Sequence, residues 1–93
     1  MSETANIAEK IEKGAVVLDV RSGQEFAAGH YPNAINIPVG DVMARSGDVG
    51  PKDTPVVVYC ESGQRSELAR LFLKAAGFTD VTNAGGLRDM PPT

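Results

Sequence analysis

The stretch VVVYCESGQRSELARLFL, residues 56–73, decides the fold. A run of β-branched residues leads to the chain's only cysteine, Cys60, and a short polar loop then enters a segment rich in helix-forming residues. A continuous apolar run, rather than an alternating one, is typical of a parallel strand that is covered on both faces. The sequence therefore predicts a buried strand at 55–60 and a helix at 66–76 that ends at Gly77.

The flanking segments repeat this alternation of strands and helices. Apolar runs predict strands at 15–20 and 34–37, and a brief strand at 78–83. Helix formers followed by glycine predict short helices over 22–30 and 40–47, and a first helix carrying Ile7, Ala8 and Ile11 that stops at Gly14. The sequence thus predicts an α/β fold, with a central, mainly parallel sheet.

Two details of this prediction concern the second half of the chain. The helix at 66–76 should turn one apolar face to the sheet, made of Leu68, Leu71, Phe72 and Ala75. The stretch 46–55 is interpreted as a surface loop. Glycines and prolines over 84–93 predict an end without regular structure, flexible from about residue 89.

Composition limits the classes of protein that fit. A length of 93 residues, 42% of them hydrophobic and 23% charged, is typical of one globular domain spanning 1–93. The net charge of -3 gives no basic stripe for binding nucleic acid. A single cysteine cannot form an internal disulfide, and one cysteine with one histidine does not give the ligand spacing of a zinc site. We therefore expect neither a disulfide nor a metal.

Location is a separate expectation. The first residues, MSETANIAEKIEKG, have neither the basic start nor the apolar centre of a secretory signal, and no apolar run approaches the ~20 residues of a membrane span. We expect no membrane contact and a cytoplasmic protein. The alternative is a periplasmic protein whose export signal has been removed.

The loop after Cys60 has the features of an anion site. In parallel α/β sheets ligands collect beyond the carboxyl ends of the strands, where Cys60 would lie. A tight turn into a helix can direct the backbone N–H groups of 61–65 at one point, and a helix N-terminus with a nearby cation such as Arg65 lowers the pKa of a thiol. Cys60 is therefore a candidate nucleophile that is ionised near neutral pH. The alternative is a small buried apolar residue at a strand end.

Several ordered motifs resemble the single-domain rhodanese family of thiosulfate sulfurtransferases. The stretch VVLDVRSGQEFAAGHYPNAINIPVGDV resembles the family's D-V-R, E-F and G-H-x-P-x-A-x-N-I-P series, VVVYCESGQRS its C-x4-R loop, and VTNAGGL its closing segment. The loop CESGQRS and the closing stretch NAGGLRDM are similar to those of small bacterial phage-shock-type members. The resemblance implies a rhodanese-like three-layer domain with helices on both faces of the sheet.

The resemblance also implies an activity that needs no cofactor. The Cys60 thiolate would take the sulfane sulfur of thiosulfate, release sulfite and hold the sulfur as a persulfide. Cyanide, a thiol or a protein thiol would then accept it. The implied substrate-binding residues are those of the loop: Glu61, Ser62, Gly63, Gln64 and Arg65. Arg65 would either orient the anionic donor or pair with a carboxylate that locks the loop, or do both.

Other activities stay open. With no second cysteine, no internal thiol can resolve the persulfide, so the sulfur must leave to an outside acceptor, as in a carrier for a protein partner. A binding or regulatory module without turnover is the alternative from another class, although the intact Cys60 argues against it. Cysteine phosphatases and arsenate reductases resemble C-x5-R, but here the sixth residue after Cys60 is Ser66, which disfavours phosphate chemistry.

The remaining candidates are interpreted as structural. Asp19 and Arg21 alternate on one strand and so point the same way, with Glu25 a little beyond them, which indicates a polar network. Ser66 is expected to cap the helix that starts there.

Residues in three further segments are interpreted from their setting in the sequence. His30 lies in a turn, and a thiolate mechanism needs no base. Gly85 and Gly86 indicate turn geometry. Arg88, Asp89 and Met90 stand where many members of the family carry a tryptophan, so the packing of the end of the chain departs from the family pattern.

Overall fold

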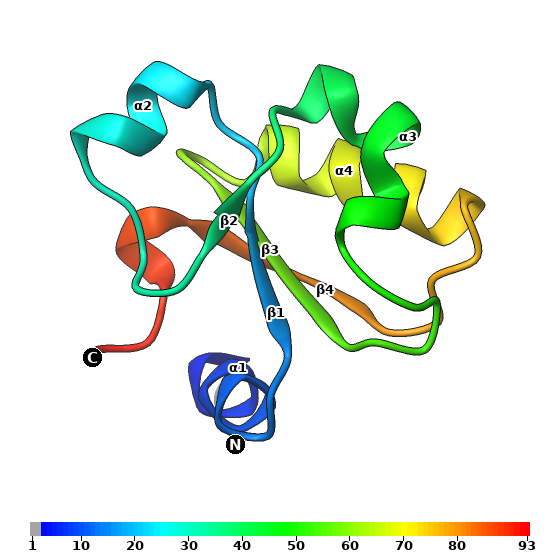
Figure 1. Ribbon diagram of the computed structural model, residues 1–93. Coiled ribbons are helices and arrows are strands. Elements are labelled where there is room, and N and C mark those ends of the chain that lie inside the picture. Colours follow the sequence, from blue (N-terminus) through cyan, green and yellow to red (C-terminus); the bar gives the residue numbers. More distant parts are fainter. Residues whose placement is uncertain (1–2) are drawn as a thin grey trace.

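Four parallel strands form the centre of the computed structural model, which describes residues 3–93 (Figure 1). They are β1 (Val16–Asp19), β2 (Ile35–Asn36), β3 (Val56–Cys60) and β4 (Val81–Gly86). The order across the sheet is β2-β1-β3-β4, and each neighbouring pair is parallel. The predicted α/β class with a parallel sheet is confirmed, and the strand that ends at Cys60 is one of the two central strands.

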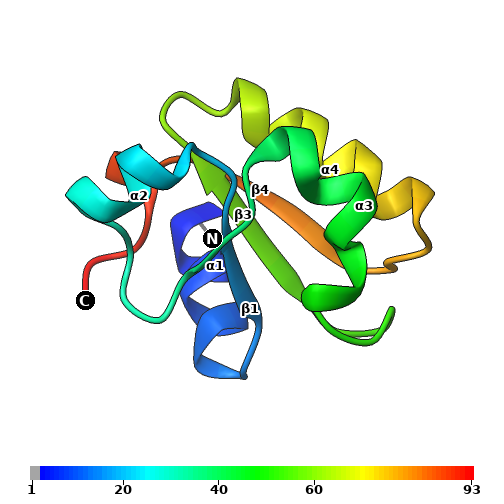
Figure 2. The same cartoon turned by 45° about the horizontal axis from the view of Figure 1, so that its top comes forward.

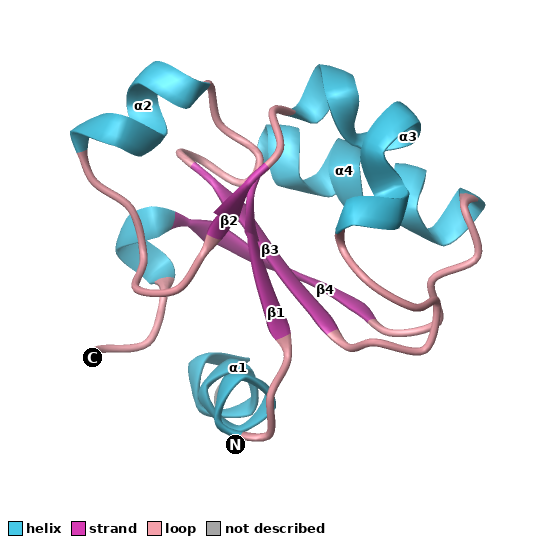
Figure 3. Ribbon diagram, in the orientation of Figure 1, coloured by secondary structure: helices cyan, strands magenta, loops and turns pink. Residues whose placement is uncertain are grey.

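Helices cover both faces of this sheet (Figures 2 and 3). They are α1 (Glu3–Glu12), α2 (Gly23–Ala28), α3 (Val42–Arg45) and α4 (Gln64–Ala75), with short 3-10 turns η1 (Val39–Asp41), η2 (Ser46–Asp48) and η3 (Leu87–Asp89). The predicted helix at 40–47 is thus divided into η1, α3 and η2. No helix within residues 3–93 combines the length and the apolar character that crossing a bilayer requires.

Alternation along the strands divides the core into two clusters. Val58 and Cys60 belong to the cluster that packs against Ala69 and Leu73 of α4. Val57 and Tyr59 point to the other face, where their cluster includes Ile7 of α1. All five side chains of β3 are buried, as expected for a central strand with helices on both sides.

The face of α4 that meets the sheet differs from the predicted one. Leu68 and Leu71 are 45% and 50% exposed, while the buried residues of α4 are Ser66, Ala69 and Leu73. Ala75 is also exposed and Phe72 only partly buried. The small side chains of Ser66 and Ala69 let α4 approach the strands closely, and this packing determines the rotation of the helix. The prediction from apolar spacing was therefore wrong for Leu68, Leu71 and Ala75, whereas Phe72 does pack against the core.

The last segment is more regular than its glycines and prolines suggest. β4 continues through Gly85 and Gly86, and η3 follows at once, so the prediction of an irregular stretch was wrong over 84–89, whereas residues 90–93 belong to no helix or strand. Met90 is 8% exposed within the second cluster, and the hydroxyl of Tyr31 donates to the carbonyl of Pro91 at 3.0 Å. Pairing with β3 holds the glycines in a strand. The assignment of 1–93 as one domain stays a prediction.

Candidate active site at Cys60

Cys60 ends β3 at the edge of the sheet where all the carboxyl ends gather. It lies opposite Gly86 in the ladder that joins β3 to β4, and its side chain is buried on the α4 side. The next residues turn sharply, because Gly63 adopts a left-handed conformation with φ of 96° and serves as the N-cap of α4. α4 therefore begins at Gln64, and the thiol lies beside its N-terminus.

The thiol sulfur receives hydrogen bonds from the backbone of this turn. The N–H of Gly63 donates to Cys60 Sγ over 3.0 Å. Burial raises the pKa of the Cys60 thiol, but hydrogen bonds from the Ser66 side chain and from the backbone of Ser66, Gly63 and Ser62 together lower that pKa below its ordinary value. The turn thus favours a thiolate, which is the reactive form of cysteine.

Ser66 has a different position from the one predicted. Since α4 begins at Gln64, Ser66 lies inside its first turn and is not the cap, so that prediction was wrong. Its buried hydroxyl lies 2.7 Å from Asn83 Oδ1 and 3.4 Å from Cys60 Sγ. The structure therefore brings Ser66 into contact with the thiol itself.

Asn83 of β4 connects the loop to the edge strand. Its side-chain amide donates to the carbonyl of Gly63 at 3.1 Å, and its Oδ1 accepts the N–H of Gly85 at 2.9 Å as well as the Ser66 hydroxyl. Sequence reasoning missed this residue, because an asparagine in a short strand has no distinctive spacing. Its only signal was its place in the closing motif VTNAGGL.

The glycines of β4 allow the loop to pack closely against the strand. A Cβ on Gly86 would lie 2.1 Å from the carbonyl oxygen of Glu61, far inside van der Waals contact. A Cβ on Gly63 would lie 3.3 Å from the Cα of Gly85. Gly86 is therefore a site of close approach, in addition to any role in a turn.

Arg65 pairs with a carboxylate from α2. Its two terminal nitrogens donate to Glu25 at 2.7 and 3.0 Å, and the hydrogen bonds from Arg65 lower the pKa of Glu25 to about 2. Glu25 also completes a capping box with Ser22, which fixes the start of α2. Of the two roles expected for Arg65, the structure contains the contact required for locking the loop.

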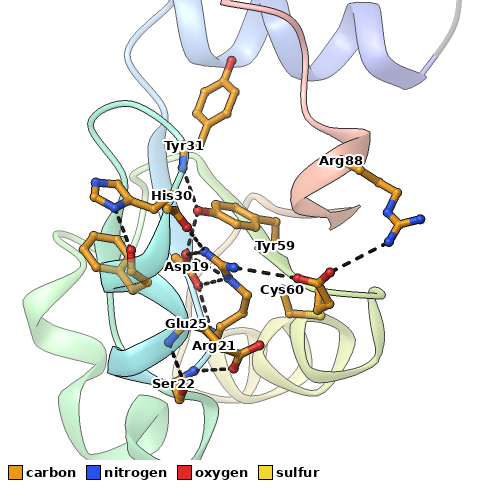
Figure 4. A network of polar contacts seen from close by, with 12 residues as sticks. Asp19, Arg21, Ser22, Glu25, His30, Tyr31, Tyr59, Cys60 and Arg88 are labelled. Atoms are coloured by element: carbon orange, nitrogen blue, oxygen red, sulfur yellow. Dashed lines mark hydrogen bonds and ion pairs between the residues drawn. The ribbon is translucent and has the colours of Figure 1, made fainter.

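A buried polar network lies on the opposite face of the sheet from the thiol (Figure 4). Asp19 accepts bonds from the side chain of Arg21 and, at 2.7 Å, from the hydroxyl of Tyr59. Burial raises the pKa of Tyr59 to about 12, so its hydroxyl stays protonated and donates. Arg21 also donates to the carbonyl of Gly29 at 2.7 Å. The network joins the ends of β1 and β3 to the loop after α2.

Glu61, the residue after Cys60, lies between two arginines. Its carboxylate oxygens are 3.8 Å from Arg21 Nη1 and 3.9 Å from Arg88 Nη2. Arg88 in η3 was not among the predicted site residues, because the sequence does not reveal that the end of β4 lies beside the loop.

The remaining candidates are more peripheral. Ser62 and Gln64 are exposed residues of the turn and the first turn of α4. His30 stacks on Phe26 with ring centroids 3.7 Å apart, and its Nδ1 lies 3.0 Å from the Phe26 carbonyl. This contact places His30 in the turn after α2, as its sequence setting indicates.

Comparison with known protein families gives a match over nearly the whole chain. The family model described as a rhodanese-like domain matches residues 3–89. Thiosulfate sulfurtransferase PspE of Escherichia coli K12 is 40% identical over 74 residues, which cover 78% of this chain and 71% of PspE. The protein YrkF of Bacillus subtilis, named a putative sulfur carrier protein, is 38% identical over 74 residues, but these cover only 40% of YrkF.

Solved structures give the same result. A rhodanese with anions from Escherichia coli superposes with a TM-score of 0.77 at 40% identity, covering 84% of this chain and 95% of that one. A human single-domain sulfurtransferase superposes with a TM-score of 0.81 at 27% identity, covering 91% of this chain and 88% of that one.

Proposed function

Because the chain belongs to the rhodanese-like domain family, we propose that it is a sulfurtransferase that carries a sulfane sulfur as a persulfide on Cys60. The observation that carries the proposal is the hydrogen-bonded thiol, with Gly63 N–H 3.0 Å from Sγ and a lowered pKa. A nucleophile of this kind, held at the N-terminus of a helix, can accept and return sulfur without a cofactor.

The first half of the reaction would take sulfur from thiosulfate. The Cys60 thiolate attacks the outer sulfur, a new sulfur–sulfur bond forms, and the bond within thiosulfate breaks with its electron pair going to sulfite. The backbone N–H groups of the turn, residues 61–65, stabilise the negative charge on the persulfide sulfur. Glu61, Ser62, Gly63, Gln64 and Arg65 are thus the proposed substrate-binding residues.

The second half would release the sulfur to a thiophilic acceptor. Cyanide or a thiolate attacks the outer sulfur of the persulfide and leaves as thiocyanate or as a new persulfide, while the Cys60 thiolate is regenerated. Cys60 is the only cysteine of the chain, so the acceptor has to come from outside it.

Arg65, Asp19, Arg21 and Ser66 have supporting roles in this proposal. The ion pair of Arg65 with Glu25 holds the first turn of α4, and the Asp19–Arg21 pair holds the end of β1. The Ser66 hydroxyl lies 3.4 Å from Sγ and donates to Asn83 Oδ1 in this structure; it would favour the thiolate by turning its hydrogen to the sulfur. None of these four residues needs to exchange a proton with the substrate.

Intact-mass spectrometry tests the proposal directly. Wild type and Cys60→Ser are incubated with thiosulfate in the absence of reductant. We expect a gain of one sulfur atom in the wild type alone, which cyanide removes as thiocyanate forms. No gain in a folded wild type with a free thiol would contradict thiosulfate as the donor.

A carrier role is the second candidate, supported by the similarity to YrkF and by the absence of a resolving cysteine. The same experiment separates the two activities. A carrier would hold the sulfur in the presence of cyanide and release it only to a protein thiol, whereas a sulfurtransferase would turn over with small acceptors. A module that only binds a partner would gain no sulfur from any donor.

A further inference from the structure

The cation expected to meet the donor is already engaged. Both terminal nitrogens of Arg65 donate to Glu25, and the hydrogen bonds are short and paired. Such a two-point contact is a strong form of ion pair, and a donor would have to break it to use Arg65 fully. A donor that leaves this pair intact would therefore need a second cation near Cys60.

Arg21, through its Nη1 alone, and Arg88 have looser contacts with a carboxylate. Both approach the carboxylate of Glu61, at 3.8 and 3.9 Å, which is ion-pair distance but too long for a hydrogen bond. The other two nitrogens of Arg21 bond to Asp19 and Gly29, and within residues 3–93 Nη1 has no hydrogen-bond acceptor. The Glu61 side chain is 54% exposed, so it can move away.

The register of the sheet places this group at the same end of the strands as the nucleophile, while the Cys60 side chain itself is turned to the α4 face. Glu61 follows Cys60 directly, and Gly86 lies opposite Cys60 in the ladder between β3 and β4. Arg88 comes two residues after Gly86, in the η3 turn that begins where β4 ends. Its side chain is 81% exposed and long enough to swing across this edge of the sheet.

We propose that Arg88, supported by Arg21, is the specificity-determining cation that attracts small anionic sulfur donors to Cys60. The Glu61 carboxylate, which lies within ion-pair distance of both arginines, would be displaced by the incoming anion. The inference rests on the proposed function, since it names the charge of the donor that the Cys60 site selects.

Glu61 and Arg88 then have opposite effects on an approaching anion. Loss of Arg88 removes an attraction and leaves the negative charge of Glu61 beside the thiol. Loss of the Glu61 charge removes a repulsion and leaves Arg88 and the Nη1 of Arg21 without a carboxylate partner at Glu61. A neutral reagent of the same size would experience neither effect to first order. The rate at which Cys60 reacts with an anionic reagent, divided by its rate with a neutral one, therefore isolates the charge selectivity of the site.

Alkylation of Cys60 by iodoacetate and iodoacetamide provides that ratio. Both reagents lose iodide to the attacking thiolate, and they differ mainly in charge. Rate constants for wild type, Arg88→Gln, Arg88→Lys and Glu61→Gln are measured by intact mass at low ionic strength. We expect Arg88→Gln to lower the iodoacetate-to-iodoacetamide ratio about three-fold, Glu61→Gln to raise it about three-fold, and Arg88→Lys to keep most of it.

Lys13→Gln is the matched control. Lys13 is also an exposed cation near a carboxylate, that of Glu9, but it lies after α1 beside Pro55 and Asp80, which precede β3 and β4 at the opposite edge of the sheet. It should leave the ratio unchanged. A ratio that Arg88→Gln does not alter, or that Lys13→Gln lowers equally, would overturn the inference.

The two proposals fail in different ways. If thiosulfate adds sulfur to the wild type while Arg88→Gln keeps the wild-type ratio, the sulfurtransferase proposal stands and the inference is wrong. If the ratio changes as expected but thiosulfate adds no sulfur, the site selects anions and another donor is required. If neither reagent alkylates Cys60 in the folded wild type, both proposals are overturned.

Discussion

The Arg65 guanidinium and the Glu25 carboxylate, forty residues apart in the sequence, meet through two hydrogen bonds of 2.7 and 3.0 Å. Arg65 is in the first turn of α4, next to the thiol, and Glu25 is in the first turn of α2. The pair thus joins the first turns of α2 and α4 at the end of the sheet where β3 ends. The pair keeps the N-terminus of α4 in a fixed position relative to Cys60.

Breaking this pair should slow sulfur transfer without removing the nucleophile. We expect Glu25→Gln and Arg65→Lys each to reduce the sulfuration rate of Cys60 about ten-fold, because small displacements of positioning groups have large effects on rate. Arg65→Lys keeps the charge but loses the paired geometry. Single-turnover mass spectrometry measures the rate.

The double variant is the control for this prediction. If both residues act through the pair, Glu25→Gln combined with Arg65→Lys should be no slower than either single variant. Multiplied effects would show that Arg65 and Glu25 act separately.

The same pair gives the protein a defined sensitivity to acid. The pKa of Glu25 is lowered from 4.5 to about 2 by the hydrogen bonds from Arg65, so its contribution to stability is complete above pH 4.5 and is lost as pH falls toward 2. Glu67 shows the same shift through Arg70 and contributes over the same range. Urea unfolding midpoints should therefore fall more gradually in Glu25→Gln than in the wild type. Parallel curves would contradict this.

Ser66 should tune the reactivity of the thiol. Its hydrogen bond is one of the contacts that lower the pKa of Cys60, so Ser66→Ala should shift the pH profile of iodoacetamide alkylation to higher pH. Ser62→Ala is the matched control, since it keeps the backbone N–H that contributes from that position. Identical profiles for Ser66→Ala and wild type, or a wild-type rate that still climbs around the ordinary thiol pKa of about 8.5, would count against an activated thiol.

Gly86→Ala should disrupt the site through backbone contact. The new Cβ would meet the Glu61 carbonyl at 2.1 Å, so either the loop or β4 has to move. We expect a loss of about 2 kcal/mol of stability and a large loss of sulfuration rate. Gly40→Ala, where a Cβ would meet no atom within 4 Å, should leave the rate unaffected. Denaturant unfolding and the single-turnover assay measure the two effects.

Tyr59→Phe should destabilise the domain from the other face of the sheet. The buried hydroxyl donates to Asp19 at 2.7 Å and accepts the N–H of Tyr31 at 3.0 Å, and its removal leaves both partners with fewer bonds. We expect a loss of about 2 kcal/mol in the free energy of unfolding. Tyr31→Phe, which loses a bond from a partly buried hydroxyl to Pro91, should cost less. Equal losses would contradict the importance assigned to the buried network.

Much of the architecture could be predicted from the sequence because it depends on local patterns. Apolar runs identified β1 and β3, and the glycine stops at Gly14 and Gly77 lie in left-handed conformations with φ of 99° and 105°. The position of Cys60 at the end of a buried strand followed from the same patterns. The ordered motifs also identified the family, which the match over residues 3–89 confirms.

What the sequence did not predict depends on contacts between distant segments. The face of α4 is determined by the close approach of Ser66 and Ala69 to the sheet, and apolar spacing selected Leu68 and Leu71 instead. Glycines over 85–86 suggested a turn, but pairing with β3 makes them a strand. Arg88 lies close to Glu61 only because that strand is in place.

The position of β3 has a consequence for motion. Its five residues are buried, all pair with β4 and four of them also pair with β1, so its backbone amides should exchange with solvent only when the whole domain opens. The amides of η3 at the end of the sheet should exchange through local fluctuations. The sulfur atom is thus anchored in the slowest-exchanging part of the chain, and Arg88 on η3 in a faster-exchanging part. Fluctuations of η3 can admit and release reactants while the nucleophile keeps its position.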